Sequence, residues 1–121
     1  LHFDGEKTIV RGNKNKLEEV VYNLCDNAIR YNKAGGEVWV TVKNTPEGKI
    51  LSVRDNGIGI SKENQKRIFE RFYRVDKSRS KKTGGTGLGL AIVKHIIEQH
   101  NFNIEVISDE NTGTTINVIM K

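Results

Sequence analysis

The sequence predicts an α+β fold, a two-layer α/β sandwich in which a mixed sheet of about five strands is covered on one face by about three helices. The chain has 121 residues, the usual length of one domain, with 36% hydrophobic and 29% charged residues. Alternating runs typical of strands are separated by segments of helical period. No repeat or run of 18 apolar residues breaks this pattern, so we expect a single domain over residues 1–121 without a membrane span.

The first part of the chain is expected to form short strands and then a long helix. Phe3 and residues 8–11 have strand character. Asn13 is the expected N-cap of a helix that continues to about Asn32, and the glycines at 35 and 36 end it.

This helix carries two different stripes. The apolar stripe, with Val20 and Tyr31 at its edge, consists of Leu17, Val21, Leu24 and Ala28. Asn23, Asn27 and Arg30 lie on a second stripe, within about 40° of one another at 100° per residue. Asparagine is a poor former of helix interiors, so two on one stripe favour a function over ordinary surface polarity.

Two strands follow, over residues 37–44 and 50–57, with a turn between them. The second strand places Leu51, Val53 and Asp55 on one face. A carboxylate that continues an apolar face needs a partner, which marks Asp55 as a candidate site residue. The alternative is an ordinary aspartate in a surface turn.

The second half should contain two helices, from Ser61 to about Phe69 and from Leu88 to Gln99, and two strands near 104–107 and 114–120. Between the helices lies a basic, glycine-ended loop over 76–86. Residues 62–82 hold nine basic and three acidic side chains, a net +6 within a chain of net +5. Such a segment attracts phosphate or is simply a solvated basic face, and its few aromatic residues give little support to a nucleic-acid module.

Six of the twelve glycines form two clusters, which let the backbone approach a ligand closely. Gly57 and Gly59 form the first; Gly84, Gly85, Gly87 and Gly89 form the second. The second cluster opens a helix, whose free N–H groups bind anions. Its spacing fits neither a Walker A loop nor the dinucleotide fingerprint.

Taken together, four segments resemble the N, G1, F and G2 boxes of the catalytic, ATP-binding domain of bacterial sensor histidine kinases. These segments are NLCDNAIRYN (23–32), DNGIGI (55–60), RIFERFYRVD (67–76) and GGTGLGLAIVKHI (84–96). They occur in the family's order, and the resemblance covers essentially the whole chain. It implies a Bergerat-type α/β sandwich, ATP and Mg²⁺ as ligands, and protein-histidine kinase activity.

The resemblance also assigns roles to residues. Asp55 would accept the exocyclic amine of adenine, and Asn27 would bind Mg²⁺ with Asn23 beside it. Arg30 would contact phosphate, Tyr31 would either cover the nucleotide or pack at the core edge, and Arg74 would approach the γ-phosphate. The remaining residues implied for the nucleotide site are Gly57, Gly59, Ile60, Thr86, Gly87, Leu88, Gly89 and Thr114. Residues 76–86 would be a flexible ATP lid. Thr114 would support Asp55, although the sequence leaves Thr114 and Thr115 as alternatives.

Asn23 bears on the choice between kinase and hydrolase. ATP-hydrolysing members of the superfamily carry a glutamate one helical turn before the magnesium asparagine, and an amide cannot act as a general base there. A serine kinase of the anti-sigma-factor type is another alternative, against which FYRVD and the basic lid favour the sensor kinases. Arg30 departs from the commoner lysine, and NFNIEV at 101–106 departs from the usual His-Gly-Gly-type turn.

The phosphoacceptor histidine is expected outside this chain, because His2, His95 and His100 do not match its context. The resemblance therefore implies a fragment of a longer kinase, with a helical dimerisation and phosphoacceptor domain and a response regulator as partners. We expect the isolated domain to be monomeric and cytoplasmic without nucleic-acid or direct membrane contact, and its parent to be membrane-anchored. The one cysteine, Cys25, fits a reducing compartment and a buried structural role.

Overall fold

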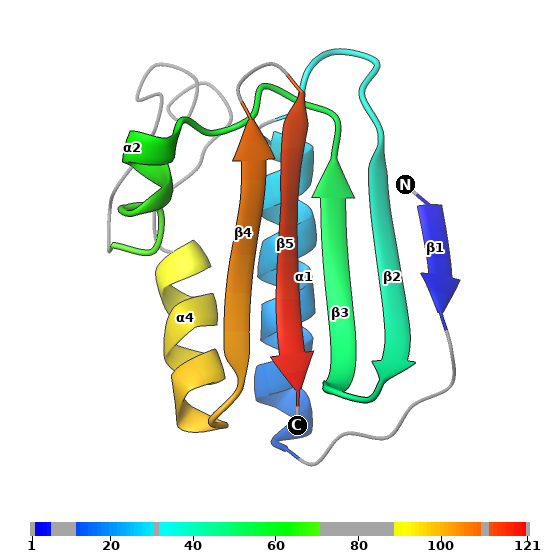
Figure 1. Ribbon diagram of the computed structural model, residues 1–121, viewed down its shortest axis with the longest axis vertical. Coiled ribbons are helices and arrows are strands. Elements are labelled where there is room, and N and C mark those ends of the chain that lie inside the picture. The colour runs from blue at the N-terminus through cyan, green and yellow to red at the C-terminus, as the bar shows by residue number, and fades with distance from the viewer. Residues whose placement is uncertain (1, 6–11, 31, 71–88, 110–111, 121) are drawn as a thin grey trace.

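The computed structural model describes residues 2–5, 12–30, 32–70, 89–109 and 112–120. A five-stranded sheet in the order β1-β2-β3-β5-β4 is covered on one face by helices (Figure 1). The strands are β1 (His2–Gly5), β2 (Val38–Thr45), β3 (Gly48–Asp55), β4 (Asn103–Asp109) and β5 (Gly113–Met120). β1 pairs with β2 in parallel and all other pairs are antiparallel, so the predicted mixed sheet is confirmed.

The inner face of the sheet forms the core against α1 (Lys14–Arg30) and α4 (Gly89–Gln99). Leu51 and Val53 are buried on this face, and Asp55 continues it as the alternation predicts. Val20, Leu24 and Ala28 are the buried residues of α1. On the opposite face of the sheet, the Arg54 guanidinium lies 4.4 Å from the centre of the Trp39 ring.

Specific hydrogen bonds hold the start of α1 against the end of α4. Asn13 is the N-cap of α1, since its Oδ1 accepts from Lys16 N at 3.0 Å. The Asn13 backbone N–H in turn donates to Nε2 of His100 at 3.1 Å, while Nδ1 of the same ring lies 2.9 Å from the carbonyl oxygen of Ile96. His100 therefore joins the start of α1 to the end of α4.

α4 ends in a left-handed residue. Asn101 has φ 57°, and the N–H of Phe102 donates to the carbonyl of Ile97 at 3.0 Å. After glycine, asparagine is the residue that most readily takes this conformation at a helix end. The unusual NFNIEV junction therefore closes the helix without glycine.

The second predicted helix is shorter than expected. α2 covers only Lys62–Gln65, with Ser61 as its N-cap, and the chain continues as turns in which Arg67 N donates to Asn64 O at 2.8 Å. Ile68 is the only fully buried apolar side chain of the described segment 61–70. One buried anchor does not stabilise a longer amphipathic helix, so the prediction of a helix to Phe69 was wrong.

Several predictions fall on residues that the structure does not describe. These are the strand at 8–11, Tyr31, Arg74, the lid over 76–86, Thr86, Gly87 and Leu88. Among the helices of the described ranges, none is long and apolar enough to cross a membrane.

Candidate functional site

Asp55 ends β3 as a partly buried carboxylate on the apolar face. Burial raises the pKa of the Asp55 carboxyl above its ordinary value, although backbone N–H groups of Gly57 and Thr114 partly oppose this. The Gly57 N–H donates to Asp55 Oδ1 at 2.9 Å. The carboxylate thus lies partly exposed at the edge of the core.

The strand register places Asp55 beside Thr114, and Thr114 beside Ser108. The three side chains form one row on the inner face of β3, β5 and β4. Thr115 instead pairs with Arg54 and Ile107, whose side chains lie on the opposite face of the sheet. Of the two threonines that the sequence left open, Thr114 is therefore the one on the same side as Asp55.

The loop after β3 packs tightly on this row. A Cβ atom at Gly57 would lie 2.9 Å from the Cα of Asn32 and 3.0 Å from Asp55 Oδ1, so only glycine fits between them. Gly59 has φ 72°, a left-handed conformation that favours glycine. The backbone N–H of Ile60 donates to the Ser108 hydroxyl at 2.8 Å, which fixes the loop to β4.

Asn32 links the end of the long helix to this loop. Its side chain is buried, its Nδ2 donates to the Glu37 carbonyl at 3.0 Å, and its Oδ1 accepts from Lys33 N at 2.8 Å. A Cβ at Gly36 would lie only 2.0 Å from the same Oδ1. The amide therefore holds the 32–37 turn against the loop that follows Asp55.

The asparagine stripe of α1 faces the start of α4. Asn23 Nδ2 donates to the Glu19 carbonyl at 2.8 Å, and its Oδ1 accepts no hydrogen bond from the described residues. A Cβ at Gly89 would lie 3.2 Å from that Oδ1, so the N-terminal end of α4 lies against Asn23. One helical turn later, Asn27 is partly exposed and has no side-chain partner within the described part of the chain.

Arg30 lies on the same stripe and forms an ion pair with Asp26, with Nε 2.9 Å from Oδ2. Both side chains are partly exposed, so the pair contributes little to stability. It does hold the guanidinium close to the helix, one turn beyond Asp26. The predicted contact of Arg30 with phosphate stays a prediction.

The structure thus gathers the predicted residues into two groups. Asp55, Gly57, Gly59, Ile60 and Thr114 surround the end of β3, and Asn23 lies with Gly89 where α1 meets α4. From Asn23, α1 continues to Arg30, about 11 Å further at 1.5 Å per residue. Asn27 and Arg30 follow Asn23 on α1. The other predicted site residues lie outside the described ranges; they are Tyr31, Arg74, Thr86, Gly87 and Leu88.

Three supporting residues escaped the sequence analysis: Asn32, Gln65 and Ser108. A signal existed for Ser108, because it continues the apolar alternation of Ile104 and Val106 just as Asp55 continues that of Leu51 and Val53. Gln65 carries no comparable signal, since its contacts depend on how the loop folds.

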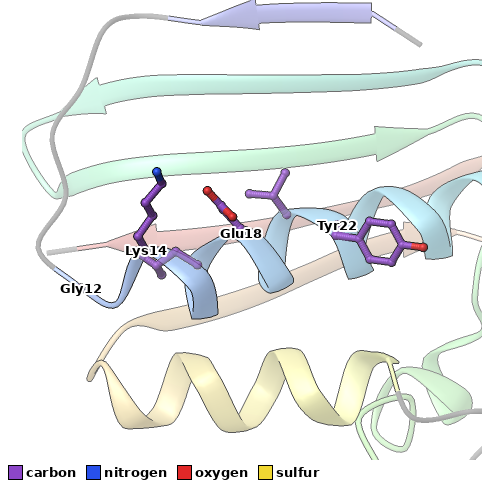
Figure 2. A pocket seen from close by; sticks show the side chains of 6 residues that line it. Gly12, Lys14, Glu18 and Tyr22 are labelled. Atoms are coloured by element: carbon purple, nitrogen blue, oxygen red, sulfur yellow. The ribbon is translucent and has the colours of Figure 1, made fainter.

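A separate groove of about 510 Å³ lies beside the N-terminal half of α1, on the side away from α4 (Figure 2). Its lining consists of Gly12, Lys14, Leu17, Glu18, Val21 and Tyr22. None of these belongs to the predicted site, and Tyr22 at its rim is 68% exposed. The groove is therefore distinct from the region around Asp55.

Comparison with known proteins places these features in a family. Residues 12–121 match the family described as histidine kinase-, DNA gyrase B- and HSP90-like ATPases. The chain belongs to this family. Its sheet, with helices on one face, is the α/β sandwich known as the Bergerat fold, and it is an ATP-binding catalytic domain of the histidine-kinase type.

Its relatives include sensor histidine kinases. The chain is 47% identical over 106 residues to the sensor-like histidine kinase SenX3 of Mycolicibacterium smegmatis, covering 88% of this chain and 28% of that protein. It is 45% identical over 105 residues to the sensor histidine kinase WalK of Bacillus subtilis, and the match covers 85% of this chain and 17% of that protein. The solved mycobacterial sensor histidine kinase MprB superimposes with a TM-score of 0.81 at 31% identity, covering 98% of this chain and 80% of that one.

Proposed function

We propose that this domain binds Mg-ATP between the two groups of residues and donates its γ-phosphoryl group to a histidine on a separate helical hairpin. The observation that carries the proposal is Asn23, an amide that faces the start of α4 one helical turn before Asn27. Hydrolases of the superfamily need a carboxylate at this position. An amide cannot remove a proton from water, so the γ-phosphoryl group is kept for a protein acceptor.

The base would bind at the end of β3. Asp55 accepts a hydrogen bond from the exocyclic amine of adenine, which gives the partly desolvated carboxylate the donor it lacks. Gly57 and Gly59 allow the backbone to approach the base. Ile60, on the same loop, donates its backbone N–H to Ser108 of β4. Thr114 supports Asp55 from the neighbouring strand. Tyr31 would cover the nucleotide.

The triphosphate would lie toward α4. Mg²⁺ takes oxygen ligands and keeps several waters, so the Asn27 amide oxygen with help from Asn23 suits it. The described residues hold no cluster of three His, Cys, Asp or Glu side chains that would bind a metal without phosphate. When bound, Mg²⁺ neutralises phosphate charge. Phosphate would be bound by Arg30 and by the backbone of Thr86, Gly87, Leu88 and Gly89. Arg74 would stabilise charge on the transferring group. Residues 76–86 would close over the site.

The parent protein would contain more than this domain, because the chain spans between 17% and 28% of the length of the curated relatives it matches. We propose a membrane-anchored sensor kinase with a dimerising phosphoacceptor hairpin, in which this domain is cytoplasmic and itself monomeric. A response regulator would be the final recipient. Nucleic acid and direct membrane contact have no part in this proposal.

Transfer of radiolabel from [γ-³²P]ATP tests the function. The domain should bind Mg-ATP and release phosphate slowly, and label should appear on the hairpin of the parent protein when that is supplied separately. Acid-labile label on His2, His95 or His100 would contradict the proposed acceptor. Rapid steady-state hydrolysis by the purified domain would favour the hydrolase alternative.

A further inference from the structure

Ser108 lies at the centre of a hydrogen-bond network directly behind the candidate base site. It is on the inner face of β4, and the register sets it beside Thr114, which lies beside Asp55. The Ser108 hydroxyl oxygen has three partners at 2.8 Å each, which are the Ile60 backbone nitrogen, the Gly113 carbonyl oxygen and Thr114 Oγ1.

Only one assignment of donors and acceptors satisfies all three hydrogen bonds of the Ser108 hydroxyl. The Ile60 N–H can only donate and the Gly113 carbonyl can only accept. Ser108 therefore gives its single hydroxyl proton to Gly113. The remaining contact, between Ser108 and Thr114, must then use the proton of Thr114. Thr114 Oγ1 is left with lone pairs alone for any other neighbour, so it is an acceptor toward the base site.

We propose that Ser108 is a positioning residue that sets the base specificity of the nucleotide site, by keeping the Thr114 hydroxyl an acceptor beside Asp55. The inference rests on the proposed function. A 6-amino purine offers two N–H donors, which match the two acceptors in direct contact. A 6-oxo purine presents an acceptor to Thr114, and that contact stays unpaired at a cost to affinity. Ser108 thereby favours adenine without touching it.

Gln65 has a related role that does not involve proton direction. Its Nε2 donates to the Ile60 carbonyl at 2.8 Å and to the Ser108 carbonyl at 3.0 Å. Both backbone polar groups of Ile60 are thus held by side chains, the N–H by Ser108 and the carbonyl by Gln65. Loss of Gln65 would loosen the loop for every purine, whereas loss of Ser108 would also free the proton of Thr114.

Dissociation constants for Mg-ATP and Mg-ITP, measured by calorimetry on the 121-residue chain, distinguish the two roles. In Ser108→Ala the preference for ATP over ITP should fall about tenfold, the effect of one hydrogen bond, and Ser108→Thr should restore it. Gln65→Met should weaken the binding of both nucleotides alike, so that the ratio of the two dissociation constants stays unchanged. Ser52→Ala is the matched control, because Ser52 donates to Asn117 on the opposite face of the sheet and should leave both constants unchanged.

A double-mutant cycle with Thr114→Val shows whether Ser108 acts through the threonine hydroxyl. Thr114→Val should by itself lower the preference for ATP over ITP, and adding Ser108→Ala should lower this preference no further. If Ser108→Ala does not fold, Thr114→Val alone decides, and an unchanged ratio overturns the inference. Equal weakening of ATP and ITP in Ser108→Ala would also overturn it and leave the proposed function intact. Failure of the parent chain to bind Mg-ATP would refute both.

Discussion

Asp55 combines two opposing influences on one carboxyl group. Burial disfavours its charge, two backbone N–H groups favour it, and the balance leaves its pKa raised. In the free domain the charged carboxylate is therefore a source of instability, which a bound donor would relieve. Such a conflict between stability and function is typical of binding sites.

Asp55→Asn should separate binding from stability. The substitution removes a charged acceptor from the proposed amine contact, so adenine nucleotides should bind about 10- to 100-fold more weakly, the loss of about 1.5–3 kcal/mol. The Tm of the free domain should not fall, because Asn resembles the neutral carboxyl that the fold prefers. Calorimetric binding and thermal melts on both proteins measure these effects, and a large drop in Tm would show that Asp55 is structural.

The difference in stability between the parent domain and Asp55→Asn should depend on pH. Because the pKa of Asp55 is raised in the folded state, the native state keeps the proton to a higher pH than the unfolded chain does. The aspartate of an unfolded chain has a pKa of about 3.9. Asp55 therefore makes the parent domain lose stability as pH rises from the unfolded pKa through the raised folded pKa. The stability advantage of Asp55→Asn should be small near pH 4 and larger at pH 7. Chemical denaturation at the two pH values tests this, and the opposite trend would contradict the raised pKa.

Asn101 tests the left-handed helix end. Asn101→Ala places an ordinary L side chain at φ 57° and should lower the free energy of unfolding by about 1 kcal/mol. Asn101→Gly fits the conformation without strain and should be neutral or stabilising by a few tenths of a kcal/mol. Urea denaturation of the three proteins gives the values, and equal stability of the Ala and Gly variants would exclude strain at this position.

Among the elements, α4 contacts α1 near both of its own ends. Asn23 meets the start of α4 at Gly89, and His100 at the end of α4 accepts the Asn13 N–H at the start of α1. The asparagine stripe is thus fixed in relation to Gly89, the residue of the second glycine cluster that the structure describes.

His100→Ala should lower the free energy of unfolding by about 1–3 kcal/mol, because the contacts of both ring nitrogens are lost and the Asn13 N–H loses its partner. His95→Ala is the control, since His95 is exposed on the same helix and should change stability by less than about 0.5 kcal/mol. Denaturant melts measure both variants. Equal losses would mean that helix composition, rather than the bond to Asn13, is responsible.

The sequence predicts some elements better than others, for physical reasons. The strand alternation identifies the inner face correctly because burial acts at every second residue, and it singles out Asp55. The same rule applies to Ser108, whose role was missed because a serine at a strand end is common. The extent of α2 and the contacts of Gln65 depend on packing between distant segments, which local periodicity does not record.

For the whole molecule, ligand binding and folding are linked. If the native state alone binds Mg-ATP, a concentration 100 times the Kd should add about 2.7 kcal/mol to the free energy of unfolding. At equal nucleotide concentration, Asp55→Asn should lose about half of this increment or more. Thermal shift with ATP, ADP and adenosine provides the measurement, and an equal shift in the parent and the variant would place the nucleotide away from Asp55.

The strand order has a consequence for how the chain folds. β2 and β3 form one hairpin and β4 and β5 another, each from local pairs, and only the β3–β5 pairing joins them. Asp55 and Thr114 belong to that late, long-range junction, where loop closure slows folding. The adenine site would therefore not exist in either half alone. We expect a nucleotide bound across this junction to slow unfolding more than it speeds folding, because long-range contacts are expected to form after local ones.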